Sequence, residues 1–166
     1  MKNTALLVMC LALSVAVLAQ DIKGTFAIKN KETGLLLRIK DAAGSNGTPL
    51  VSYTPINWKC ATWEFQSRGG NVYGLKNLFT GKTFQPVADS LREGTALGQQ
   101  PLKAGADKQV YEFIAVDKDA YLIRLKGTEY YLSPSESGEV NSPIVLSKKT
   151  GGQRQQWTLY EQHPTM

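Results

Sequence analysis

The sequence repeats itself three times with a period of about 47 residues, and this repetition restricts the possible fold more than any other feature. Each copy opens with an aromatic residue in a short alternating run and closes with an aromatic, a polar and an apolar residue. The openings are Phe26-Ala27-Ile28, Tyr73-Gly74-Leu75 and Tyr121-Leu122-Ile123. The closing triplets are Trp63-Glu64-Phe65, Tyr111-Glu112-Phe113 and Trp157-Thr158-Leu159. Two landmarks that recur in the same register in three copies indicate three equivalent structural units.

Within each copy, apolar and polar residues alternate over short runs that are bounded by Gly, Pro, Asn or Asp. This period of two, in segments rich in β-branched and aromatic residues, predicts β-strands. No long stretch keeps a convincing helical period. About four strands in each copy give about twelve strands in all, and we therefore predict an all-β fold.

The number of copies selects the architecture. A β-propeller needs at least about four blades, so three copies cannot close one. A β-trefoil, which is a closed barrel with three hairpins, fits three copies of this size, and we predict that fold. Its repeats are expected over about residues 24–70, 71–118 and 119–162. The closing aromatics Trp63, Tyr111 and Trp157 are then expected to pack in one shared core.

The first residues of the chain have the layout of a secretory signal peptide. Residues 1–19 contain one charge, Lys2, followed by an apolar run and small residues before the break. The run is shorter than the about 20 apolar residues that span a bilayer. We therefore expect residues 20–166 to form a single domain of a secreted or periplasmic protein, without a membrane span.

Composition limits the chemistry that the chain can perform. The net charge is +5, but no basic block resembles a nucleic-acid-binding stripe, so no nucleic-acid partner is expected. The only histidine, His163, lies near the C-terminus, and Cys60 has no histidine partner in the sequence. These residues do not provide a nucleophile with its base or a histidine-rich metal site. We predict a protein that is not an enzyme and needs no metal or cofactor.

The closing segments carry a family signature. The third copy contains Gln155-Gln156-Trp157, a Gln-x-Trp motif, and the second contains Gln109-Val110-Tyr111. In the first copy, Ala61 stands where the glutamine would be. With the threefold period, these motifs make the chain resemble the ricin B-type lectins over about residues 24–162. The resemblance implies a β-trefoil that binds a glycan or glycoconjugate, usually through galactose-type sugars, without metal or catalysis.

The sequence departs from the sugar sites of that family. Where the family has a site aspartate, this chain has Arg38, Gln85 and, depending on the alignment of the third copy, Tyr131 or Ser133. The family's glutamine is replaced by Val51, Gly98 and Val145. Its aromatic platform corresponds to Tyr53, Gln100 and Ser147. Because only Tyr53 keeps an aromatic ring, the resemblance singles out the first copy.

We predict one weak sugar site in the first repeat. Sugars are held by an aromatic face against their C–H groups and by polar side chains that bond their hydroxyls. Tyr53 is expected to stack on the ring, and Trp58, in a loop over residues 54–62, is expected to wall the site. Asp41 and Asn57 are expected to bond the sugar hydroxyls.

Two other functions remain open at this point. The chain could bind a protein partner or inhibit a protease through an exposed loop, for which residues 54–62 and 101–109 are candidates. It could also be an accessory subunit of a secreted complex, and the missing aspartates favour these two alternatives. Asn46-Gly47-Thr48 is an N-glycosylation sequon, which would be used only in a eukaryotic secretory route.

Overall fold

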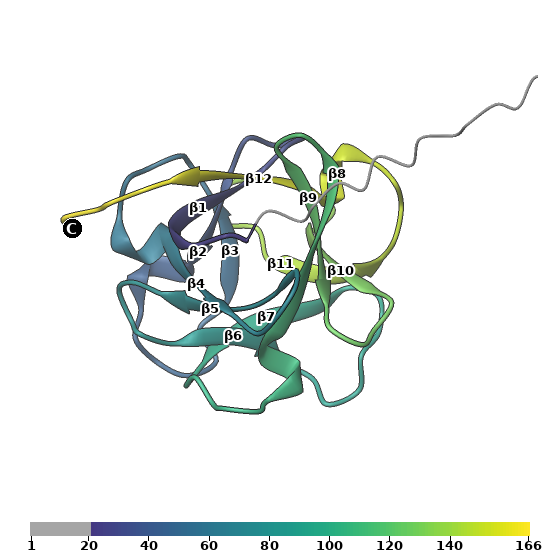
Figure 1. Cartoon of the computed structure of the whole chain (residues 1–166), viewed down its shortest axis with the longest axis horizontal. Coiled ribbons are helices and arrows are strands. Elements are labelled where there is room, and N and C mark those ends of the chain that lie inside the picture. Colours follow the sequence, from purple (N-terminus) through teal and green to yellow (C-terminus); the bar gives the residue numbers. More distant parts are fainter. Residues whose placement is uncertain (1–20) are drawn as a thin grey trace, which may run out of the picture.

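The computed structural model describes residues 21–166, so the predicted signal peptide lies outside the described residues (Figure 1). Over this range the chain forms twelve β-strands and four short 3-10 helices, with no α-helix. The all-β prediction is therefore confirmed. None of the helices described between residues 21 and 166 has the length and apolar character needed to cross a membrane.

The strands are short and follow one another through turns and loops. The first six are β1 (Gly24–Asn30), β2 (Leu36–Ile39), β3 (Leu50–Tyr53), β4 (Thr62–Ser67), β5 (Val72–Asn77) and β6 (Thr83–Pro86). The last six are β7 (Thr95–Gln100), β8 (Val110–Asp117), β9 (Ala120–Leu125), β10 (Tyr130–Pro134), β11 (Ile144–Lys148) and β12 (Gln156–Glu161). The 3-10 helices are η1 (Lys40–Ala42), η2 (Lys59–Ala61), η3 (Asp107–Gln109) and η4 (Gln153–Gln155).

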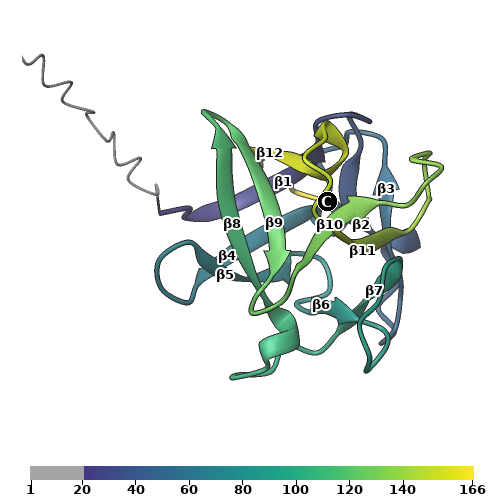
Figure 2. The same ribbon diagram turned by 90° about the vertical axis from the view of Figure 1, so that its right-hand side faces the viewer.

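Six of the strands close a barrel. In antiparallel order, β1 pairs with β4, β4 with β5, β5 with β8, β8 with β9, β9 with β12, and β12 returns to β1. The other six form three hairpins, β2–β3, β6–β7 and β10–β11. Figure 2 shows the three hairpins gathered on one side of the molecule and the barrel on the other. This arrangement is a β-trefoil, as predicted.

The three hairpins also contact one another around a pseudo-threefold axis. The bridging pairs are Pro49 with Gly98, Ala96 with Val145, and Pro143 with Val51. Just ahead of each bridge, Gly47, Gly94 and Asn141 adopt left-handed φ angles of 81°, 79° and 67°. Their backbone N–H groups donate to carbonyls of a neighbouring hairpin at 2.7, 2.9 and 2.7 Å. Glycine and, less readily, asparagine tolerate this conformation, which explains why a glycine or an asparagine stands at each of these three positions.

The core is built around the three closing aromatics. Trp63, Tyr111 and Trp157 are at most 1% exposed, which confirms that they are buried equivalents. Each side chain donates a hydrogen bond to a backbone carbonyl in the second strand of its own repeat. The bonds are Trp63 Nε1 to Leu37 O at 3.0 Å, Tyr111 Oη to Phe84 O at 3.0 Å and Trp157 Nε1 to Leu132 O at 3.1 Å. Burial also raises the pKa of the Tyr111 phenol well above its usual value, so this hydroxyl stays a donor.

The buried glutamines of the Gln-x-Trp motifs have a structural role. Gln155 Nε2 donates to the Lys148 carbonyl at 2.7 Å, and its Oε1 accepts from the Thr150 N–H at 2.8 Å. Gln109 bonds the equivalent loop, accepting from the Lys103 N–H at 2.9 Å. The motif therefore fixes the loop that leads into the closing strand of its repeat.

We predict that Trp157→Ala lowers the free energy of unfolding by about 3–5 kcal/mol, because it removes a large side chain from a packed core. Trp157→Phe keeps most of the ring volume but leaves the Leu132 carbonyl without its donor, at a smaller cost of about 1–3 kcal/mol. Urea denaturation of both variants measures these differences. A Trp157→Ala variant as stable as the parent would contradict the role assigned to this ring.

Candidate functional site

The outer face of the β2–β3 hairpin brings Arg38 and Tyr53 together. Tyr53 lies opposite Leu36, and Arg38 lies opposite Val51. Because side chains two residues apart in a strand lie on the same face, all four share the face turned away from the core residue Leu37. The guanidinium carbon of Arg38 lies 3.8 Å from the centroid of the Tyr53 ring. The guanidinium is therefore stacked on one face of the tyrosine.

The loop that follows β3 adds a second aromatic ring to this face. Trp58 lies immediately before η2, and its ring centroid is 6.0 Å from the guanidinium carbon of Arg38. Both rings are thus within the range of a cation–π interaction with one arginine. Trp58 is 37% exposed and Tyr53 is partly buried. We call Arg38, Tyr53 and Trp58 the first-repeat cluster.

The other two residues predicted for the site occupy different places. Asp41 is exposed in η1, beyond the end of β2, whereas Tyr53 pairs with Leu36 at the start of β2. The hairpin therefore separates Asp41 from Tyr53 along its length. Asn57 is exposed and directly precedes Trp58, at the edge of the first-repeat cluster. The ligand roles expected for Asp41 and Asn57 remain predictions.

Arg38 is the residue of this cluster that the sequence pattern did not mark as functional, because it stands where the family has an aspartate. Arg38 is 6% exposed, and among residues 21–166 it is the only buried residue with a charged side chain. Its Nε atom is buried without a hydrogen-bond partner. A single arginine inside the apolar run of β2 was the signal available in the sequence.

The second and third repeats use the equivalent side chains for internal bonds. The strand register places Gln85 and Ser133 at the position of Arg38, which settles the alignment of the third copy in favour of Ser133 over Tyr131. Gln85 Oε1 accepts a hydrogen bond from Gln109 Nε2 at 2.9 Å. Ser147, at the position of Tyr53 in the third repeat, likewise accepts a hydrogen bond through its Oγ from Gln155 Nε2 at 2.9 Å.

The second repeat is also closed sterically. A Cβ atom added to Gly98 would lie 2.8 Å from Val87 Cγ1 and 3.2 Å from the Gly47 carbonyl oxygen. The Val87 side chain and the Gly47 carbonyl of the first hairpin therefore occupy the space that a side chain would need at Gly98. Among the three equivalent places, only the first repeat presents aromatic rings beside an arginine whose buried Nε lacks a partner.

The loop that carries Trp58 is held by the C-terminal segment, whose end lies past β1 in Figure 1. Gln162 Nε2 donates to the Ile56 carbonyl at 3.2 Å, and its Oε1 accepts from the Thr62 hydroxyl at 2.8 Å. Further along, the Lys59 N–H donates to the Met166 carbonyl at 2.6 Å. Gln162 thus bonds the loop that carries Trp58. In the first repeat it takes the role of the closing-motif glutamine, which is replaced there by Ala61.

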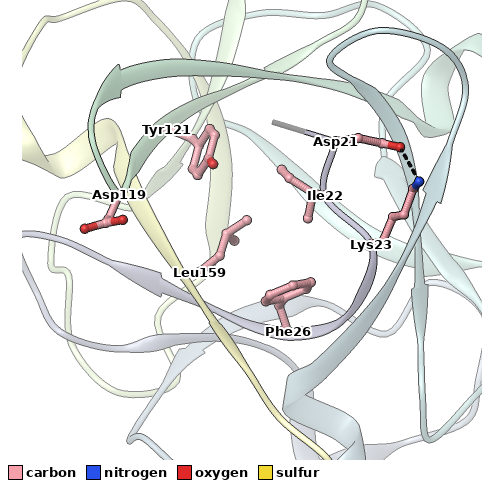
Figure 3. Close-up of a pocket in the computed structure, with 7 residues that line it drawn as sticks. All are labelled: Asp21, Ile22, Lys23, Phe26, Asp119, Tyr121 and Leu159. Atoms are coloured by element: carbon pink, nitrogen blue, oxygen red, sulfur yellow. Dashed lines mark ion pairs between the residues drawn. The ribbon is translucent and has the colours of Figure 1, made fainter. Parts of the chain in front are cut away.

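A pocket of about 240 Å³ lies on the barrel side of the molecule (Figure 3). Its walls come from three barrel strands, the β8–β9 turn and the first described residues: Asp21, Ile22, Lys23, Phe26, Asp119, Tyr121 and Leu159. Asp21 and Lys23 form an ion pair at 3.1 Å, and the Ile22 N–H donates to Tyr73 Oη at 3.0 Å. This pocket combines aromatic rings with carboxylates, so it is the second place at which a sugar could bind.

The two side chains with the greatest chemical reactivity are not part of either place. Cys60 is buried and unpaired, and His163 is exposed beside Glu161 at 3.1 Å. Between residues 21 and 166, His, Cys, Asp and Glu side chains form no group of three or more that could hold a metal ion.

Comparison with known proteins relates the chain to one family. The model of the ricin-type beta-trefoil lectin domain-like family matches residues 59–147, which is more than half of the chain. Among curated protein sequences, none matches.

Solved structures share the fold at low sequence identity. A designed three-fold symmetric protein, ThreeFoil, is 19% identical, with a TM-score of 0.79 over 84% of this chain and 99% of that chain. The Rhizoctonia solani agglutinin is 18% identical, with a TM-score of 0.75 over 86% and 98%. A ricin B-like lectin of Macrolepiota procera, in complex with lactose, is 20% identical, with a TM-score of 0.70 over 86% and 99%.

We predict that Gln162→Ala lowers the free energy of unfolding by about 1–3 kcal/mol, because it removes the partners of the Ile56 carbonyl and the Thr62 hydroxyl. Hydrogen exchange should rise in the loop over residues 54–59. The matched control is Gln153→Ala, since Gln153 is exposed. Equal exchange in the two variants would show that the C-terminal segment does not order this loop.

Proposed function

Because the chain belongs to the ricin-type β-trefoil lectin domain-like family, we propose that it is a carbohydrate-binding module with one glycan site, at the first-repeat cluster. The observation that carries this proposal is the grouping of Arg38 and Tyr53, on one face of the first hairpin, with Trp58 of the loop that follows it. An exposed tryptophan next to polar donors is the combination that holds a sugar ring.

The contacts of Arg38 change the roles expected for the two rings. One face of Tyr53 is covered by the guanidinium at 3.8 Å, whereas Trp58 keeps 37% of its surface exposed. We therefore assign the stacking surface to Trp58 and a side contact to Tyr53. We propose that Asn57, which precedes Trp58 in the chain, bonds a sugar hydroxyl; Asp41, in η1 beyond the end of β2, stays a predicted ligand.

We further propose that the module is exported and does not catalyse a reaction. The signal-peptide pattern of residues 1–19 supports export to a secreted or periplasmic location. The side chains available for nucleophilic catalysis support the second point, because Cys60 is buried and His163 lies on the exposed C-terminal segment.

Glycan binding is tested first with lactose, the sugar in the Macrolepiota procera lectin structure, and then with a glycan array. One stacked ring and a few exposed hydrogen bonds must offset the ordering of sugar and side chains, so we expect a Kd near about 1 mM, or about −4 kcal/mol. An array identifies the ligand, and calorimetric titration of the best hit measures the affinity.

Single substitutions then locate the site. Trp58→Ala is expected to abolish binding and Tyr53→Ala to abolish or strongly weaken it, because both rings belong to the first-repeat cluster. Gln100→Ala and Ser147→Ala, at the places equivalent to Tyr53 in the other repeats, are expected to leave the Kd unchanged. Titration of each variant with the same glycan provides the comparison.

The other outcomes point to other functions or other sites. Loss of binding in Asp119→Asn, with full binding in Trp58→Ala, would move the site to the barrel-side pocket. If no glycan binds at all, the module is better explained by a protein partner or a protease that contacts the loops over residues 54–62 or 101–109. Inhibition assays and interaction screening with the folded protein would then replace the array.

A further inference from the structure

The environment of Arg38 is unusual for a buried arginine. Within residues 21–166, the Arg38 side chain forms no ion pair with a carboxylate and no hydrogen bond. By contrast, Arg124 pairs with Glu112, and Arg154 pairs with Glu32 at 2.8 Å. Of the Arg38 nitrogens, only Nε is buried without a partner, so the two terminal nitrogens keep contact with solvent.

A charge in this position is costly to the protein. Removing a guanidinium from water without an anionic partner is unfavourable, and arginine does not lose its proton in proteins. Stacking on Tyr53 at 3.8 Å offsets part of this cost, because the ring face attracts a cation. The flat face of the guanidinium is satisfied in this way, but the buried Nε–H has no partner and the terminal N–H groups have no partner within the described part of the protein.

The chemistry of these donors indicates what would complete the site. Arginine donors match the oxygens of a carboxylate or a sulfate, which can accept two parallel hydrogen bonds. Trp58, 6.0 Å from the guanidinium, offers an exposed ring surface next to the same donors. A single ligand that is both a sugar and an anion would use both groups at once.

We propose that the first-repeat cluster binds an acidic saccharide, a sugar that carries a carboxylate or a sulfate group. The anionic group bonds the terminal nitrogens of Arg38, and the sugar ring packs on Trp58. This inference rests on the proposed carbohydrate-binding function and specifies its ligand class. The net charge of +5 favours the approach of such a ligand.

The other two repeats indicate why there would be one acidic site. The residues equivalent to Arg38 are Gln85 and Ser133, which are neutral. Gln85 already accepts a hydrogen bond from Gln109, and Ser133 donates to the Pro134 carbonyl at 3.1 Å. Neither place offers a cation to an anionic sugar.

The test compares three sugars that differ in one substituent. Galactose, galacturonate and galactose 6-sulfate are titrated into the folded protein by calorimetry or NMR at constant ionic strength. We expect at least one acidic sugar to bind about tenfold more tightly than galactose, and the tighter of the two identifies carboxylate or sulfate as the group. Free acetate and free sulfate are titrated as well, and binding as tight as that of the acidic sugar would contradict a saccharide site.

Two substitutions with the same change in net charge separate a specific contact from general attraction. Arg38→Gln is expected to remove the advantage of the acidic sugar. Arg92→Gln, at an exposed arginine, is expected to keep it. Arg38→Lys keeps the charge but loses the paired donors, and it should retain only part of the advantage. Thermal unfolding of each variant, with and without the acidic sugar, reports folding and binding in one measurement.

The outcomes distinguish this inference from the proposed function. If galactose binds and neither acidic sugar binds more tightly, the acidic ligand is wrong and the carbohydrate-binding function stands. If Arg38→Gln, or Arg38→Lys where the first variant does not fold, keeps the full advantage of the acidic sugar, Arg38 is not its partner. If neither these sugars nor any glycan on an array binds the parent protein, the proposed function itself is overturned.

Discussion

The hydrogen bond between each closing aromatic and a strand carbonyl is the interaction on which the rest of this structure depends. Trp63, Tyr111 and Trp157 each bury a large ring in the common core, and each ring has one polar atom that needs a partner there. The partner is a carbonyl of the second strand of the same repeat. Each bond therefore fixes the position of one hairpin relative to the barrel.

This bond also sets the position of the candidate site. The carbonyl that accepts from Trp63 belongs to Leu37, whose side chain packs in the core. Because alternate residues of a strand lie on opposite faces, Arg38 is carried to the outer face of the hairpin, where Tyr53 covers one side of its guanidinium. Leu37, which accepts the core hydrogen bond, and Arg38, which belongs to the first-repeat cluster, are thus adjacent residues of β2.

A symmetric backbone here carries three different sets of side chains. In the second and third repeats, the polar groups at the site positions bond the glutamines of the Gln-x-Trp motifs and fix nearby loops. In the first repeat that glutamine is replaced by Ala61, and Gln162 bonds the loop from the C-terminal segment. In the first hairpin, Arg38 and Tyr53 do not bond such a glutamine and stack on each other instead.

The sequence alone determined the strand content, the threefold fold and the three core aromatics, because these follow from local alternation and from a period that repeats in register. It also identified Tyr53 as the one remaining aromatic at a family site position. Only the tertiary structure decided that Ser133, and not Tyr131, is equivalent to Arg38, since strand register depends on pairing across the hairpin. Arg38 stacks on Tyr53, 15 positions further along the chain. Gln162 bonds the carbonyl of Ile56, 106 positions before it. No local pattern encodes such contacts, because they form only when the closed barrel brings distant segments to the same face.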